Sequence, residues 1–171
     1  LRKGDVVTGI RHRAGPENRD IFEELIAGCP VLDVEGRVDA GALFAQAGEK
    51  LSPLVGLSPD EVAALLMARE EESTTVVAPG LAIPHVILEG DQPVAMLVAR
   101  SRDGAEFPGQ KDAPVQFTFV IIGSRQARNL HLRILSAIAQ LYQKPGFEDM
   151  LTAARDPEAM RQVILGMRRK V

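Results

Sequence analysis

The segment VQFTFVIIG (residues 115–123) decides the fold class. It is apolar almost throughout, which is typical of a central strand covered on both faces. A second apolar strand candidate, PVAMLVARS (93–101), precedes it, and the polar segment between them (102–114) is a predicted loop. The β-branched run STTVVA (73–78) and the short PVLDV (30–34) predict two more strands. Strands this apolar do not leave one face of a sheet in water, so we expect helices on both faces.

Helical patterns lie on both sides of this block of strands. Asp20 and Asp39 are N-cap candidates for two early helices, and Ser58 begins the capping box SPDE of a third. A long amphipathic helix is predicted over about 125–143, and two shorter ones follow it. This order predicts an α/β fold, a three-layer α/β/α sandwich with a central mixed sheet of four or five strands flanked by helices on both faces.

The composition is that of a globular protein. The chain has 171 residues, 46% hydrophobic and 25% charged, with a formal net charge of −3. That charge argues against a general nucleic-acid surface, so we expect no nucleic-acid partner. Basic residues gather at residues 1–19 and in the RRK run at 168–170. Two interpretations stay open for them: a solvated surface, or contact with an anionic membrane surface or an acidic partner.

Residues 1–19 show weak periodicity and are predicted as a basic lead-in or linker, with residues 20–171 as one domain. No apolar run approaches the ~18 residues that span a bilayer, and no signal peptide is visible. Cys29 is the single cysteine, which excludes an intramolecular disulfide and favours a reducing compartment. We expect a cytoplasmic domain. The first residue is Leu rather than Met, which fits a processed chain or the cytoplasmic domain of a longer membrane protein.

Several classes of chemistry lack their motifs in this sequence. There is neither GxGxxG nor GxxxxGK[ST], the fingerprints of dinucleotide and nucleoside-triphosphate sites. No nucleophile elbow is present. The three histidines, His12, His85 and His131, are too scattered to predict a metal site. We therefore expect no metal and no cofactor.

His85 is the most informative polar residue. It follows Pro84, whose fixed φ restricts how the histidine is presented, and the preceding LAI (81–83) is expected to be buried. An unprotonated imidazole nitrogen serves as a nucleophile or base near neutral pH. The alternative is a structural histidine bonded to a backbone carbonyl. His131, beside the apolar stripe of the long helix, has the same two interpretations, and His12 is expected to be solvated.

Two motifs resemble a known family. LLMAREEESTTVVAPGLAIPH (65–85) resembles the signature of the enzyme IIA domains of the fructose–mannitol and nitrogen-regulatory class, in the sugar phosphotransferase system. NLHLRILSAIAQL (129–141) is similar to the second family motif, in which a histidine begins a helix. The resemblance covers roughly residues 20–167. The residues that match the first motif are Arg69-Glu70, Ser73-Thr74, Gly80, Ala82-Ile83-Pro84 and His85.

The resemblance implies that His85 accepts a phosphoryl group from a histidine phosphocarrier protein, with Arg69 and His131 at the same site. An arginine fork suits phosphate oxygens. Glu70 and Glu71 either orient Arg69 or belong to a solvated acidic run. The candidate hydroxyl donors to the phosphate are those of Ser73, Thr74 and Thr75.

The chain also differs from the family pattern in two segments. TVVAPG (75–80) replaces a glycine-rich segment, and Val86-Ile87-Leu88 follows His85 where the family tends to have Gly and a basic residue. The first hypothesis is therefore that the domain is a phosphoryl carrier with a regulatory function. Any enzymatic activity would be at most this phosphotransferase-type transfer. The alternative is an unphosphorylated regulatory or binding domain, fused to or associated with a membrane transporter, that uses the same pocket for an anion or partner. A third interpretation is an unrelated α/β enzyme with His85 as general base.

Overall fold

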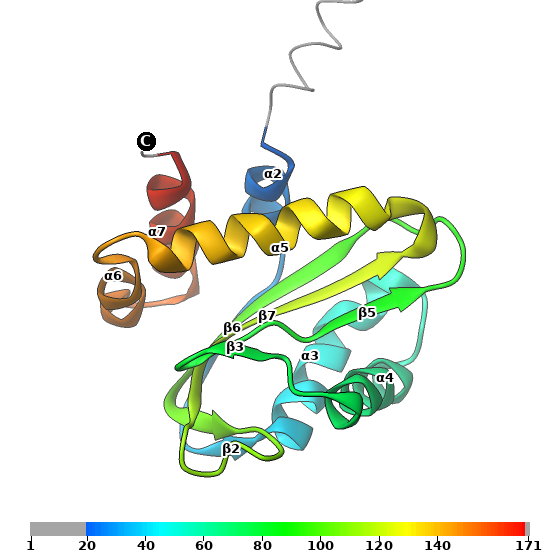
Figure 1. Ribbon diagram of the computed structural model, residues 1–171, viewed down its shortest axis with the longest axis horizontal. Helices are drawn as coiled ribbons and strands as arrows, with labels where there is room; N and C mark the ends of the chain where they lie inside the picture. The colour runs from blue at the N-terminus through cyan, green and yellow to red at the C-terminus, as the bar shows by residue number, and fades with distance from the viewer. Residues whose placement is uncertain (1–19, 170–171) are drawn as a thin grey trace, which may run out of the picture.

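A mixed β-sheet is the framework of the computed structural model, which describes residues 20–169 (Figure 1). The predicted central strand is β7 (Val115–Ser124), and β6 (Ala95–Glu106) pairs with it antiparallel. On the other side of β7 lie β4 (Leu81–Ala82) and β5 (His85–Leu88), both parallel to it. The two apolar segments identified in the sequence therefore form the middle of the sheet.

Short strands complete the sheet. β1 (Val31–Val34) and β2 (Val38–Asp39) run parallel to β6, and β3 (Val76–Ala78) pairs antiparallel with β4. The sheet order is β1-β6-β7-β4-β3, with β2 on β6 and β5 on β7. Among the described strands β5 has β7 as its single neighbour, so its outer side is an edge of the sheet.

Helices cover both faces of the sheet, as Figure 1 shows. One face carries α2 (Ile21–Gly28), α5 (Arg128–Gln143), α6 (Phe147–Ala153) and α7 (Pro157–Arg169), and the other carries α3 (Ala40–Val55) and α4 (Pro59–Glu72). A 3-10 turn, η1 (Arg125–Ala127), leads into α5. The α/β/α sandwich is confirmed. Within residues 20–169 no single helix is long and apolar enough to span a bilayer; only α3 and α4 together reach that length and composition, and they are bent by 116°.

Each face of the sheet has its own core because side chains alternate along a strand. In β6, Met96 and Val98 belong to the core between the sheet and α2, α5, α6 and α7. Leu97 and Ala99 belong to the core between the sheet and α3 and α4. All four side chains are at most 1% exposed. The near-continuous apolar run of the sequence is thus explained by burial on both faces.

The predicted helix starts are confirmed. The Asp20 side chain accepts hydrogen bonds from the first turn of α2, and Asp39 accepts one from the first turn of α3. Ser58 and Glu61 exchange both hydrogen bonds of the capping box. These contacts involve residues at most three positions apart, and the local sequence therefore predicts them.

Three strand predictions need correction. The sheet has seven strands rather than four or five, because β2, β4 and β5 are only two to four residues long and show no periodicity of their own. The predicted strand over 73–78 is reduced to the three residues of β3. The predicted loop over 102–114 begins later, because β6 continues to Glu106 after an irregularity between Arg100 and Ala105.

A buried arginine joins the sheet to α6. Arg100 is 1% exposed, and its Nε and Nη2 donate to the two carboxylate oxygens of Asp33 at 3.0 and 2.6 Å. Its Nη1 donates to the carbonyls of Leu151 and Thr152 at 2.8 and 3.2 Å. One guanidinium therefore connects β1, β6 and the end of α6.

The basic C-terminal pair is matched by acidic residues of α2. Arg168 Nε lies 2.5 Å from the Asp20 carboxylate, and Arg169 Nε lies 2.6 Å from that of Glu23. These two arginines are therefore engaged within the domain rather than free for an anionic surface. The predicted basic lead-in, residues 1–19, lies outside the described residues.

Candidate functional site

His85 begins β5 at the open edge of the sheet. It is in register with Ile121 of β7, a residue of the α5-side core. Its Nδ1 lies 2.6 Å from the carbonyl oxygen of Ile83. A carbonyl can only accept, so Nδ1 carries the proton and donates it, and Nε2 keeps its lone pair. The arrangement satisfies the structural interpretation of His85 and also leaves one ring nitrogen free to react.

Arg69 approaches Nε2 of His85 from the helix layer formed by α3 and α4. It lies in the last turn of α4, and its Nη2 is 3.4 Å from His85 Nε2. Its Nη1 donates to the carbonyl and the hydroxyl of Ser73, at 2.9 and 3.3 Å. The guanidinium is thus held beside the imidazole at the sheet edge, where the α4 and α5 layers meet.

His131 approaches His85 from α5. The centroids of the two rings are 5.4 Å apart, with 63° between the ring planes. His131 is 3% exposed, and neither of its ring nitrogens has a hydrogen-bond partner within the described part of the chain. Burial lowers the pKa of His131, and repulsion between the two rings when both are protonated lowers it further. His131 is therefore a neutral, buried imidazole at neutral pH.

Gly123 of β7 makes room for the second histidine. An ideal Cβ at this position would lie 3.0 Å from Nδ1 of His131. A Cβ here would press on the ring, which would have to shift by a few tenths of an ångström. No sequence pattern points to Gly123, because the contact joins a strand to a helix that follows it in the chain.

A hollow of about 440 Å³ lies beside Arg69 and His85. Its walls are largely apolar, and Leu65 and Ile87 are 36% and 45% exposed. The charged lining residues are Arg69 and Glu72. The hollow is large enough for a phosphoryl group, and its rim offers apolar contacts to an approaching molecule.

The three predicted hydroxyls have different surroundings. Ser73 accepts a hydrogen bond from Arg69 and lies next to the site. The Thr74 hydroxyl accepts from the Val76 N–H at 3.1 Å, within its own exposed turn. Thr75 is 1% exposed and its hydroxyl donates to Glu70. Thr75 is therefore turned away from the hollow, and we leave it out of the candidate site.

Glu70 has neither of the roles considered from the sequence. It is 3% exposed and binds Thr75, so it is not part of a solvated run, whereas Glu71 beside it is exposed. Its carboxylate binds Thr75 rather than Arg69, and Arg69 donates to Ser73. The burial of a single residue in an acidic triplet could not be recognised from composition.

Comparisons with known proteins identify the family. The model of the family described as "Phosphoenolpyruvate-dependent sugar phosphotransferase system, EIIA 2" matches residues 38–166. The chain belongs to this family. The family match removes the interpretation as an unrelated α/β enzyme.

Relatives of this EIIA domain include regulatory and transport proteins. A nitrogen regulatory protein of Bradyrhizobium diazoefficiens is 30% identical over 135 residues, which is 79% of this chain and 86% of the relative. The fructose-specific EIIABC component of Bacillus subtilis is 24% identical over 148 residues, 86% of this chain but 20% of the relative. The crystal structure of nitrogen regulatory protein IIA-Ntr from Neisseria meningitidis has a TM-score of 0.72 at 26% identity, covering 85% of this chain and 99% of that one.

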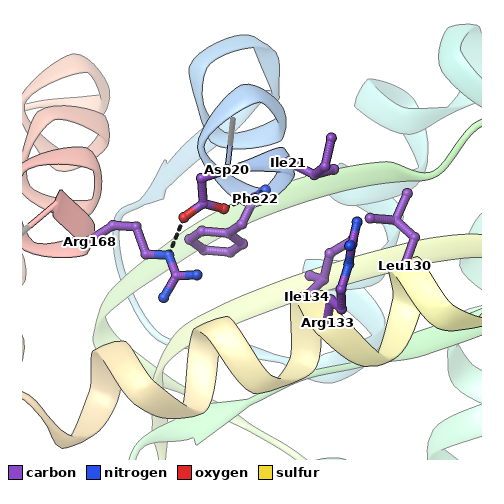
Figure 2. A pocket seen from close by; sticks show the side chains of 7 residues that line it. All are labelled: Asp20, Ile21, Phe22, Leu130, Arg133, Ile134 and Arg168. Atoms are coloured by element: carbon purple, nitrogen blue, oxygen red, sulfur yellow. Dashed lines mark hydrogen bonds and ion pairs between the residues drawn. The ribbon is translucent and has the colours of Figure 1, made fainter. Parts of the chain in front are cut away.

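A second hollow of this EIIA domain is lined by neither His85 nor His131. It has a volume of about 320 Å³ and lies between α2, α5 and α7. In Figure 2 the Arg168 side chain points toward the Asp20 carboxylate, and Arg133 projects from α5. None of the predicted site residues lines this hollow. Residues 20–169 hold no cluster of three histidine, cysteine or acidic side chains that could bind a metal ion.

Proposed function

We propose that this EIIA domain accepts a phosphoryl group on Nε2 of His85 from a histidine phosphocarrier protein. One observation carries the proposal: the Ile83 carbonyl binds Nδ1 at 2.6 Å, which leaves the Nε2 lone pair facing Arg69 at 3.4 Å. A nucleophilic nitrogen and a phosphate-binding cation therefore meet at one point beside the hollow. Membership of the EIIA family supports the same chemistry.

The transfer step needs no proton movement. The Nε2 lone pair of His85 attacks the phosphorus, and the nitrogen–phosphorus bond of the carrier's phosphohistidine breaks. Its electron pair returns to the carrier's imidazole. The proton stays on Nδ1 throughout, held by the Ile83 carbonyl. Positioning and charge neutralisation provide most of the catalysis in such a displacement.

Two side chains are proposed to hold the transferred group. The phosphoryl group brings about two negative charges, and the Arg69 fork offers two parallel donors to its oxygens. Ser73 anchors the far side of that fork. His131 supplies a neutral N–H donor, because its lowered pKa keeps one ring nitrogen protonated and the other free. Its ring nitrogens are both unpartnered within the described residues, which leaves one available for a phosphate oxygen.

A regulatory role in the cytoplasm is part of the proposal. Nitrogen regulatory proteins are among its relatives of about its own length, as in Bradyrhizobium diazoefficiens. The Bacillus subtilis relative, a fructose-specific component about five times longer than the matched region, supports association with a transporter. A solved complex of enzyme IIA mannitol with phosphorylated enzyme IIB mannitol from Escherichia coli shares the fold, at a TM-score of 0.62 and 14% identity. A phosphorylated protein is therefore the proposed class of partner.

Phosphotransfer from purified components tests this function. Incubation with phosphoenolpyruvate, enzyme I and the phosphocarrier protein should add one acid-labile phosphate to the domain. His85→Ala should abolish the label, whereas His12→Ala, the same substitution at another histidine, should keep it. Absence of label on the unsubstituted domain, with a carrier shown to phosphorylate another EIIA domain, would contradict the proposal.

The apolar rim of the hollow favours a second candidate function. Leu65 and Ile87 are exposed next to His85, which suits a protein segment that docks without phosphoryl transfer. The domain would then regulate an associated transporter by binding alone. In that case His85→Ala leaves the regulatory effect intact, and Ile87→Asp abolishes it.

A further inference from the structure

A buried carboxylate lies at the end of α4, inside an otherwise exposed acidic run. Glu70 is 3% exposed, while Glu71 and Glu72 are exposed. Its Oε2 accepts the Thr75 N–H at 2.9 Å, and its Oε1 accepts the Thr75 hydroxyl. Burying a carboxylate is costly unless hydrogen bonds satisfy its oxygens. Both oxygens are satisfied here, so this one side chain anchors Thr75 to the end of α4.

Thr75 transmits this fixed position to the histidine. Its carbonyl accepts the Ile83 N–H at 2.9 Å, and the Ile83 carbonyl accepts the Nδ1–H of His85 at 2.6 Å. Thr75 and Ile83 are 1% and 3% exposed, so water does not replace these bonds. A continuous series of hydrogen bonds therefore runs from Glu70 to the imidazole.

We propose that Glu70 is a positioning residue that sets the tautomer of His85. The inference rests on the proposed function, because the group it controls is the reacting nitrogen. Glu70 fixes Thr75, Thr75 fixes Ile83, and the Ile83 carbonyl keeps the proton on Nδ1. Only this tautomer presents a lone pair at Nε2 to an incoming phosphoryl group.

Removal of Glu70 has a defined chemical consequence. In Glu70→Ala the N–H and hydroxyl of Thr75 lose their acceptor, and the chain between Thr75 and Ile83 loses its anchor on α4. The Ile83 carbonyl then no longer stands in one place opposite Nδ1. The proton distributes over both ring nitrogens, and the fraction of His85 that can react falls.

The chain offers a conservative variant and a matched control. In Glu70→Gln the amide oxygen can accept the Thr75 N–H, and the amide nitrogen can donate to the hydroxyl oxygen, which rotates to accept. That variant keeps the series of hydrogen bonds without the charge. Glu71→Ala removes the same charge from the neighbouring, exposed position.

The tautomer of His85 is the measurement that a merely structural role would not change. Nitrogen-15 NMR of histidine-labelled protein, with the His85 signals assigned by their loss in His85→Ala, gives the ratio of the two neutral forms. The unsubstituted domain and Glu71→Ala should show the Nδ1–H form. Glu70→Ala should shift the ratio toward Nε2–H by about fivefold, the equivalent of one net hydrogen bond. Glu70→Gln should show the same tautomer ratio as the unsubstituted domain.

The rate of phosphoryl acceptance should follow the tautomer. Glu70→Ala is expected to accept phosphate more slowly, by the same factor by which its Nδ1–H fraction falls in the NMR measurement, whereas Glu70→Gln and Glu71→Ala keep the original rate. A folded Glu70→Ala with an unchanged tautomer ratio overturns the inference. If Glu70→Ala does not fold, Glu70→Met takes its place, because methionine fills the buried volume and accepts neither bond from Thr75. An unchanged His85 tautomer in a folded Glu70→Met then overturns it.

Failure of this inference can be told apart from failure of the proposed function. A domain that takes no phosphate from an active carrier contradicts the function, while the tautomer ratio still decides the role of Glu70. A domain that takes phosphate, and whose His85 tautomer is the same in Glu70→Ala, contradicts only the positioning role.

Discussion

Arg100→Met should lower the free energy of unfolding by about 3 kcal/mol at pH 7. Arg100 is 1% exposed and supplies two donors to Asp33 and one to the carbonyls at the end of α6. Removing one partner of a buried ion pair costs about 3–5 kcal/mol. The lower end applies because Asp33 is 17% exposed and keeps Arg102, whose Nη2 lies at 3.3 Å. Methionine fills a similar volume, so the loss is mainly electrostatic.

Thermal unfolding of the variant and a matched control measures this loss. For a domain of this size the expected decrease in Tm is about 6–12 °C. Arg102→Met is the control, because it removes the same charge from a side chain that is 45% exposed beside the same carboxylate. That substitution should cost less than about 1 kcal/mol. Equal losses in the two variants would refute the reasoning.

The pH dependence of stability is an independent check of the Arg100–Asp33 ion pair. The hydrogen bond from Arg100, with a smaller contribution from Arg102, holds the pKa of Asp33 below its usual value. A carboxylate with a lowered pKa in the folded state stabilises the protein above its unfolded pKa, about 3.9, and that stability is lost as the pH falls through the folded pKa. The difference between Arg100→Met and the unsubstituted domain should therefore shrink on acidification. If the urea midpoints of Arg100→Met and the unsubstituted domain differ by the same amount at pH 7 and at about pH 3, the Arg100–Asp33 pair is not the source of the difference.

Two further predictions concern helix packing and the buried histidine. A Cβ at Gly48 would overlap the carbonyl oxygen of Pro59, so Gly48→Ala should separate α3 from α4 and lower the unfolding free energy by about 1–3 kcal/mol; an unchanged urea midpoint would contradict this. The lowered pKa of His131 means that the unfolded chain binds this proton first, so stability should decrease as the pH falls below about 6.5. His131→Gln should lack that decrease in urea titrations between about pH 7 and 5, and the same slope in both proteins would exclude His131 as its source.

The sequence was most informative where the contacts are local. Asp20, Asp39 and Ser58 each bond to backbone within the next three residues, and all three helix starts follow from residue type and spacing alone. The buried strand 115–124 was predictable for a different reason, because burial on both faces leaves an unbroken apolar run in the sequence.

The site required contacts that no local pattern encodes. β5 is four residues long, and its partner β7 lies far along the chain. Which glutamate of the acidic run is buried depends on how α4 meets the edge of the sheet, and this selects Glu70 over Glu71. Gly123 leaves room for the ring of His131, a close contact between a strand and a helix. Each of these features becomes visible only when distant segments are brought together.

The ion pairs between α2 and α7 have a practical consequence for engineering. Asp20 and Arg168 are in contact although 148 positions separate them. A short linker from residue 169 to residue 20 would close the described chain into a ring at a small cost in loop entropy. New termini in the exposed turn around residues 108–112, between β6 and β7, would then give a circular permutant. The Asp20–Arg168 ion pair would then lie in the interior of the permuted sequence, where it would hold the new linker closed.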